Sequence, residues 1–273
     1  MLNFFVSRRA GQSRLGPTLW SALVLTLLLG GASPAAAHLV NANASLVPVS
    51  GVVPAIIAIP GSVQFSPNRG GQIKFKLRGV LNPMTGKALT SVNNTIDVDL
   101  VINGVPQTFT AIFSIKSGNA IGTFPSLNLL KNDLVEIQGA TVKDSVGVPF
   151  GTMGVKHPGL HFSTAIIPVF GVPIDIDADA RIIASNGGKF MIDIELESPP
   201  LTRLNNTVEL EIAVNGGAPF VVSQTFDIID GDGATLVPLG LLAGDIVEVL
   251  RVDVYDATAT RFATAGIRIL SPL

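Results

Sequence analysis

Apolar and charged residues alternate with a period of two along several short stretches of the chain. Residues 73–78 alternate apolar with basic side chains, whereas residues 96–100 and 192–197 alternate apolar with acidic ones. A period of two places one set on the buried face of a β-strand and the other on the opposite face. The pattern therefore predicts β-strands. The apolar members of these stretches are Ile73, Phe75, Leu77, Ile96, Val98, Leu100, Ile192, Ile194 and Leu196.

Turn sequences separate these stretches. Asn103-Gly104 and residues 117–119, 215–217 and 230–233 are rich in asparagine, aspartate and glycine, which are favoured in tight hairpin turns. Short strands with a turn signal about every ten residues are typical of two β-sheets packed face to face. We find no convincing amphipathic helix after residue 37, so we expect an all-β fold built as a β-sandwich.

The chain repeats itself at a spacing of 112 residues. Residues 93–100 recur as residues 205–212 with only conservative differences, and the same frame runs without a gap from Asn93 to Gly154. Chance does not easily hold one register for so long, and self-similarity at a fixed period is the mark of repeated structural units. We therefore predict two tandem β-sandwich domains, residues 38–162 and residues 163–273.

Three parts of the repeat carry a family resemblance: a Leu-Leu-x-x-Asp-[Leu/Ile]-Val-Glu stretch, an aspartate in the next turn, and a last strand with Phe-x-Thr-x-Gly-[Val/Ile]. The pattern resembles bacterial immunoglobulin-like tandem domains. The resemblance implies a sandwich used as a spacer, an adhesive module or a binding module, and it carries over no functional residue. These parts lie at residues 129–136, Asp144 and 150–155 in the first copy, and at 241–248, Asp256 and 262–267 in the second.

The first 37 residues have the layout of a secretory signal peptide. Three arginines precede an apolar run at residues 19–29, and the small residues Ala35-Ala36-Ala37 follow it. The alternative, an uncleaved membrane anchor, is disfavoured because about ten apolar residues are too few to span a bilayer comfortably. We predict cleavage after Ala37 and a secreted or periplasmic protein, with no later segment long and apolar enough to span a membrane.

Charge is divided unequally between the copies. Residues 38–162 hold nine basic and five acidic residues, a balance of +4, and residues 163–273 hold six and fifteen, a balance of −9. Where the first copy has Lys76 on a strand face, the second has Asp193. Two interpretations follow: the copies attract each other head to tail, within or between molecules, or these are solvated faces whose charges pair across neighbouring strands.

Two unusually apolar segments, residues 52–59 and 165–172, each precede a repeat core, with Ala55-Ile56-Ile57 matching Ala165-Ile166-Ile167. Proline is tolerated in both if each segment is the first strand at the edge of a sandwich. The alternative interpretation is a strand that pairs with another subunit.

Oxygen ligands for calcium are available where the second copy begins. Asp175, Asp177 and Asp179 alternate, so an extended backbone presents all three carboxylates on one side. The run does not fit an EF-hand loop, because Ala180 stands at the required glycine and Asn186 at the bidentate glutamate.

Copper is a second candidate metal. Cleavage after Ala37 makes His38 the N-terminal residue, and its amine and imidazole together can chelate Cu(II). The N-terminus then looks a little like those of periplasmic copper carriers and copper-dependent polysaccharide oxygenases. The other imidazoles are His157 and His161, and nothing in the sequence places them near His38.

Other functions find little support. The chain has no cysteine and none of the common nucleophile, zinc-protease or phosphate-loop motifs, so we predict neither disulfides nor catalysis. The net acidity argues against nucleic acid, and the single tyrosine after residue 37, Tyr255, argues against a sugar site. The leading hypothesis is an exported structural or adhesive protein that binds a protein partner or associates with itself. The alternative is a metal-binding module at Asp175, Asp177 and Asp179 or at His38.

Overall fold

The computed structural model describes residues 42–49, 61–68, 70–82, 84–124, 127–156, 159, 162–183, 187–198 and 201–268. Every regular element in them is a β-strand, which confirms the predicted all-β fold, and they contain no helix suited to cross a membrane. The signal-peptide prediction and His38 lie outside the described residues. The strands are β1 (Ala42–Pro48), β2 (Gly61–Ser66), β3 (Gln72–Leu77), β4 (Ser91–Ile102), β5 (Val105–Ile115), β6 (Ala120–Thr123), β7 (Leu134–Lys143), β8 (Pro149–Lys156), β9 (Phe162–Pro168), β10 (Asp175–Ile183), β11 (Lys189–Ser198), β12 (Arg203–Val214), β13 (Phe220–Ile228), β14 (Asp232–Pro238), β15 (Ile246–Tyr255) and β16 (Arg261–Arg268).

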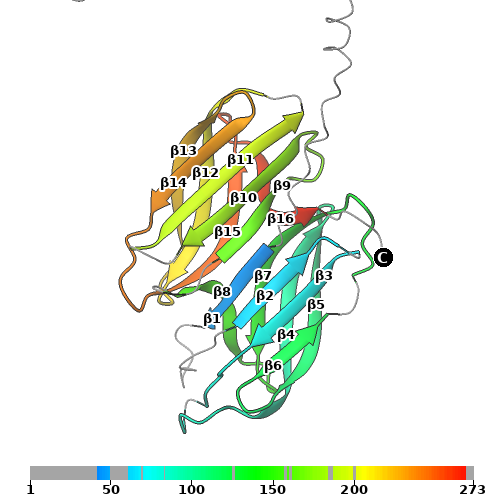
Figure 1. Ribbon diagram of the computed structural model, residues 1–273, viewed down its shortest axis with the longest axis vertical. Helices are drawn as coiled ribbons and strands as arrows, with labels where there is room; N and C mark the ends of the chain where they lie inside the picture. Colours follow the sequence, from blue (N-terminus) through cyan, green and yellow to red (C-terminus); the bar gives the residue numbers. More distant parts are fainter. Residues whose placement is uncertain are drawn as a thin grey trace, which may run out of the picture. The chain divides into compact units, whose positions relative to one another are not determined.

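Each copy contributes two runs of four paired strands. In the first copy these are β1-β2-β3-β6 and β5-β4-β7-β8, and in the second they are β9-β10-β11-β14 and β13-β12-β15-β16. The runs form two layers, which is consistent with a sandwich (Figure 1). Apolar side chains of both layers meet in the core: the rings of Phe75 on β3 and Phe113 on β5 are 4.9 Å apart. The period of two holds, since Ile73, Phe75 and Leu77 are buried and Lys74 is exposed.

The layers of each copy also join along one side. Leu46 on β1 pairs with Met153 on β8 in the first copy, and Ile166 on β9 pairs with Ala265 on β16 in the second. Strand β1 is therefore the topological counterpart of β9. The apolar segment at residues 52–59, which the sequence matched to residues 165–172, lies outside the described residues.

The two copies meet along a seam with internal two-fold pseudosymmetry. Strand β8 pairs with β15 of the other copy in the register Gly154–Glu248, and β16 pairs with β7 in the register Gly266–Glu136. Adding 112 to the numbers of the first-copy residues turns one pairing into the other. Strands β1 and β9 complete the seam. The charged strands β3 and β11 take no part in these pairings, so attraction between their faces is not what joins the copies.

Glycine is required where the last strand of each copy meets the other copy. A Cβ atom on Gly266 would lie 2.4 Å from the carbonyl oxygen of Val135, and one on Gly154 would lie 2.2 Å from that of Val247. Real Cβ contacts are never that short, so a side chain there would force the two backbones apart. The glycine of the repeated Thr-x-Gly pattern is thus explained by close approach of two strands.

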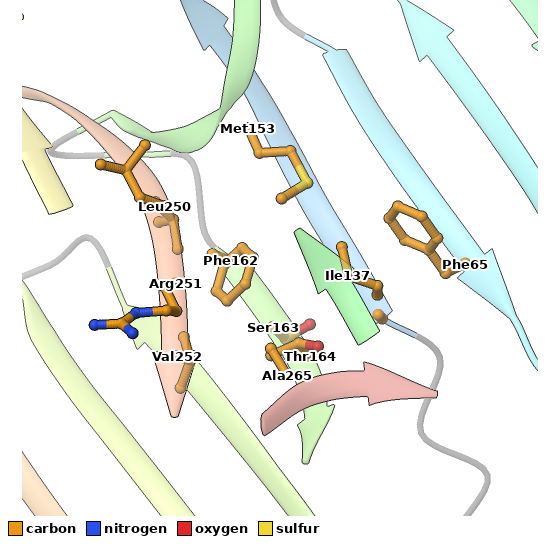
Figure 2. Close-up of a pocket in the computed structure, with 12 residues that line it drawn as sticks. Phe65, Ile137, Met153, Phe162, Ser163, Thr164, Leu250, Arg251, Val252 and Ala265 are labelled. Carbon is orange, nitrogen blue, oxygen red and sulfur yellow. The ribbon is translucent and has the colours of Figure 1, made fainter. Parts of the chain in front are cut away.

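The seam is packed as closely as a domain core. A cavity of only about 10 Å³ remains in it, which is the space of at most one water molecule. Its lining comes from both copies, with Phe162 in the middle of side chains that include Ile137, Met153 and Leu250 (Figure 2). This cavity is too small for a ligand. The predicted division into domains 38–162 and 163–273 stays a prediction, while residues 38–273 form one compact unit.

The predicted gapless repeat frame is wrong over one stretch. Thr110 pairs with Asp97, whereas Ser223 pairs with Glu209, so β5 and β13 correspond at a spacing of 113 rather than 112. The turn before β13 contains one additional residue, in the region of Gly217. At the start of β7 and β15 the two copies again correspond at a spacing of 112 residues. Identical motifs on either side hid this compensated insertion.

Candidate functional site

Strand β5 is a long strand at the edge of its sheet, and it carries no charge. Its eleven residues, Val-Pro-Gln-Thr-Phe-Thr-Ala-Ile-Phe-Ser-Ile, have high β-propensity. It pairs with β4, and no other described strand pairs with it. Two of its apolar side chains are exposed, Ile112 by 74 % and Val105 by 57 %. Edge strands of this kind normally carry lysines or other charges that prevent pairing with another chain.

The turn that precedes β5 decides which of its backbone groups face outward. Asn103 and Gly104 have φ values of 48° and 82°, as a two-residue hairpin requires. Val105 then forms a hydrogen-bonded pair with Ile102, and the bonding alternates along the strand. The N–H and C=O groups of Thr108, Thr110 and Ile112 consequently point to the open edge. Pro106, which has no N–H, occupies the first such position, where its missing donor costs nothing in the β4 ladder.

Polar side chains line the outer face beside this edge. Thr108 donates a hydrogen bond to Asp99 over 2.6 Å, and Thr110 donates one to Asp97, also over 2.6 Å. Lys143 on β7 forms an ion pair with Asp97 at 2.6 Å. Partial burial alone would raise the pKa of Asp97, but the hydrogen bonds from Lys143 and Thr110 outweigh it and lower that pKa. Asp97 and Asp99 are thus held in contacts with neighbouring strands.

Strand β13 is the equivalent edge of the second copy. It pairs with β12 and with no other described strand, and Asp227 is its only charged residue. By the spacing of 113, Val221, Ser223 and Thr225 take the outward positions of Thr108, Thr110 and Ile112. Strand pairing runs from one edge to the other through the seam, in the order β5-β4-β7-β16-β15-β12-β13. Strands β5 and β13 are therefore the two ends of one continuous path of strands (Figure 1).

Buried acids and arginines form a second polar cluster, across the seam. Arg261 on β16 contacts Glu136 of the first copy at 3.5 Å and Asp253 of its own copy at 3.2 Å. Both carboxylates are buried, with 4 % and 0 % of their surface exposed. Burial raises the pKa of Glu136 by more than the nearby Arg261 lowers it. Arg261 thus brings one positive charge to both buried acids.

Arg251 extends this cluster along β15. Its Nε lies 3.2 Å from Glu211 and 3.3 Å from Asp253, although neither contact has the alignment of a hydrogen bond. The first copy has Gly139, Thr141 and Pro149 at the positions of Arg251, Asp253 and Arg261, so the cluster breaks the pseudosymmetry. An open cleft of about 570 Å³ lies beside it, with Phe170 and β5 residues Pro106–Thr108 also in its wall.

Replacing Glu136 by glutamine is expected to change how stability depends on pH. Because the pKa of Glu136 is raised by folding, the folded state binds more protons than the unfolded state just above pH 4.5. The wild type therefore loses free energy of unfolding from this group as pH rises through that window, and Glu136→Gln does not. Urea unfolding between pH 4 and pH 7 should show the variant gaining relative to the wild type.

Glu248→Gln is the matched control for that experiment, because Glu248 is the pseudosymmetric counterpart of Glu136 and is only half-buried. It removes the same negative charge from the same kind of seam position. A difference in free energy of unfolding between Glu136→Gln and wild type that is the same at every pH would contradict the raised pKa of Glu136.

The predicted calcium ligands lie on β10, where Asp179 contacts Arg181 and stands opposite Asp193 of β11 in the backbone register. Arg181 forms an ion pair with Asp179, including a contact of 3.0 Å from Nη2. The backbone register sets Asp177 opposite Glu195, while the side chains of Asp175 and Asp177 are outside the described residues. The described part of the chain contains no group of three acids or histidines arranged to hold a metal. Calcium at these aspartates, and copper at His38, both stay predictions.

Several motif residues have structural roles that the sequence did not reveal. Asn103 donates to Asp133 over 2.8 Å, and Asp133 accepts the backbone N–H of Leu130 over 2.8 Å, so the pair joins two neighbouring turns. The second copy repeats this with Asn215 and Asp245. Asp144 accepts two backbone N–H groups of its own turn, as predicted for a turn residue. These repeated residues stabilise the turns of the fold.

The sequence analysis predicted neither the open β5 edge nor the buried cluster of charged residues at the seam. The edge strand had a usable signal, eleven residues without a charge, but nothing in the sequence says that β5 is an edge. The seam cluster had a weaker signal, namely charged residues on the last strands of the second copy without counterparts in the first.

The sequence has been compared with known proteins. No protein-family model matches it, and the search of curated proteins finds no relative. The class of protein is thus defined by the fold alone, as an all-β protein of two similar copies.

Proposed function

We propose that this chain is an exported, non-enzymatic structural protein that binds extended segments of protein along edge strand β5. It belongs, in this proposal, among the tandem immunoglobulin-like β-sandwich proteins, and it acts outside the cytoplasm after loss of residues 1–37. The observation that carries the proposal is the length of β5 without a charged side chain. An open edge of that kind is a liability for solubility unless it is used for binding.

Two further observations support strand addition as the mode of binding. The outward groups of Thr108, Thr110 and Ile112 supply backbone donors and acceptors at alternate residues, which is what an added strand needs. The threonine hydroxyls are already engaged by Asp97 and Asp99, so the strand is held extended before a partner arrives. Pre-ordering of this kind lowers the entropy lost on binding.

The proposal predicts that wild-type protein binds a short peptide of alternating valine and threonine and that Ile112→Pro does not. Proline removes the outward N–H of residue 112, which takes no part in the β4 ladder, so the fold should persist while strand addition is blocked. Loss of affinity by about tenfold or more, equivalent to about 1.4 kcal/mol, is expected in fluorescence anisotropy with a labelled peptide.

Ile112→Thr is the matched control, because it changes the same exposed side chain but keeps the N–H. It should bind the peptide with nearly wild-type affinity. Equal binding by Ile112→Pro, at an unchanged melting temperature, would rule out the β5 edge. Absence of binding by the wild type would rule out the mode of recognition.

A further inference from the structure

Two long edge strands end one layer of the described chain, β5 without a charged residue and β13 with Asp227 alone, and their relation limits what each can bind. Strands β5 and β13 end the same path of paired strands and occupy equivalent places in the two copies. The seam between the copies already uses the other shared surfaces, namely β1, β7 and β8 with β9, β15 and β16. Among the described strands, those left open on one side are β5 and β13 in one layer and the shorter β6 and β14 in the other.

Charge distinguishes the ways in which two molecules can join through these edges. Pairing β5 with β5 brings together two copies of charge +4, and pairing β13 with β13 brings together two of charge −9. Pairing β5 of one molecule with β13 of the next brings together two copies of opposite net charge, +4 and −9. Complementary charge favours encounter and selects among otherwise similar contacts.

We propose that the partner of β5 is a second copy of this chain, which adds its β13 strand antiparallel to β5. This inference rests on the proposed function and names the occupant of its edge. Each molecule has one edge of each kind, so the contact is heterologous: it leaves a free β5 at one end and a free β13 at the other. Such a contact continues into a filament unless its geometry closes a ring.

The pairing has a definite expected register. The outward residues must face each other for hydrogen bonds to form, and they are the even-numbered positions of β5 and the odd-numbered positions of β13. Two registers under that condition overlap all nine residues of β13, with Thr110 opposite either Thr225 or Ser223 of the second molecule. We propose the one that sets Thr110 opposite Ser223. Thr108 then faces Thr225 of the second molecule, and Ile112 faces Val221 of the second molecule.

Cysteine cross-linking tests this directly, because the chain contains no cysteine of its own. Two variants of the mature chain are made, Thr110→Cys and Ser223→Cys, and each is oxidised alone and in an equal mixture. The proposal expects a disulfide-linked dimer in the mixture and little in either variant alone. A variant with both substitutions should give a ladder of higher oligomers.

Salt and a second pair of variants complete the test. Raising sodium chloride from about 20 mM to about 500 mM should lower the yield of disulfide-linked dimer on the order of tenfold. The reason is that salt screens the attraction between the first copy of one molecule and the second copy of the next. Val146→Cys, at an exposed turn between β7 and β8, mixed with Ser223→Cys measures random collision. Adding Ile112→Pro to Thr110→Cys should abolish the product without loss of folding.

The outcomes separate this inference from the function on which it rests. Dimers of Thr110→Cys alone at the yield of the mixture would mean β5–β5 pairing and would overturn the inference. A yield in the mixture no higher than the Val146→Cys control would overturn it as well. If the valine–threonine peptide still binds the wild type in either case, the β5 edge retains its proposed function with another partner. If the peptide also does not bind the wild type, both the β5–β13 pairing and the proposed function of β5 are rejected.

Discussion

Replacing Gly266 by alanine is expected to lower the free energy of unfolding by about 3 kcal/mol, the upper range for overpacking a closely packed site. The added Cβ would lie 2.4 Å from the Val135 carbonyl oxygen and 2.5 Å from the Ile167 side chain. Backbone cannot move aside there without breaking the pairing of β16 with β7. Urea unfolding followed by intrinsic tyrosine fluorescence or circular dichroism measures the effect.

Gly139→Ala is the matched control, because Gly139 also lies in a seam strand, β7, but no atom lies within 4 Å of the position its Cβ would take. That change should be neutral or stabilise by up to about 1 kcal/mol, since alanine restricts the unfolded chain. Gly154→Ala, the pseudosymmetric counterpart of Gly266→Ala, should be as harmful as Gly266→Ala. Similar stabilities for Gly139→Ala and Gly266→Ala would contradict the close approach at the seam.

Replacing Arg261 by alanine is expected to destabilise the protein by about 3 kcal/mol near neutral pH, because it leaves buried Glu136 without its cation and Asp253 with Arg251 alone. Glu136 and Asp253 come from different copies, so their repulsion then acts across the seam. The cost should shrink as pH falls, because Glu136, whose pKa is raised by burial, then accepts a proton. Thermal unfolding at several pH values measures this.

Two other variants define what Arg261 contributes. Arg261→Lys keeps the charge but loses the planar fork that reaches both acids, so it should fall between alanine and wild type. Arg181→Ala breaks an ion pair whose arginine side chain is 59 % exposed, and should cost less than about 1 kcal/mol. If Arg181→Ala lost as much free energy of unfolding as Arg261→Ala, the large effect of Arg261→Ala could not be due to the burial of the seam acids.

Much of the fold was predictable because it depends on local pattern. The alternation of Ile73, Phe75 and Leu77 with basic residues predicts a strand with one buried face, and the structure buries those three. Asn103-Gly104 predicts a two-residue turn, and its φ values are those of one. Turn geometry and a period of two follow from the residues themselves.

The repeat was predictable in outline and misjudged in detail. Matching motifs before and after β5 and β13 showed that the copies share one fold. They also concealed the additional residue near Gly217, because a compensated insertion leaves both flanking motifs in frame. Only the pairing of Thr110 with Asp97 and of Ser223 with Glu209 reveals it.

The candidate sites, unlike the strands and turns, could not be predicted from the sequence. The sequence pointed to Asp175, Asp177 and Asp179 as a group, but an ion pair between Asp179 and Arg181 depends on where a long side chain folds back. The β5 edge, in contrast, was not considered, because a strand is an edge only by virtue of the neighbour it lacks. That is a property of sheet order, which a single strand does not encode.

By itself, the amino-acid sequence determined that this protein is built of strands, that it contains one unit written twice, and that the two units differ in charge. Tertiary structure alone decided that the units meet through a two-fold seam, that glycine is needed at 154 and 266, and that β5 and β13 are left as open edges. The reason is that alternation and turn chemistry act between residues a few positions apart. The seam arises from pairings between strands about ninety or more residues apart, whose partners are chosen by how complete surfaces fit.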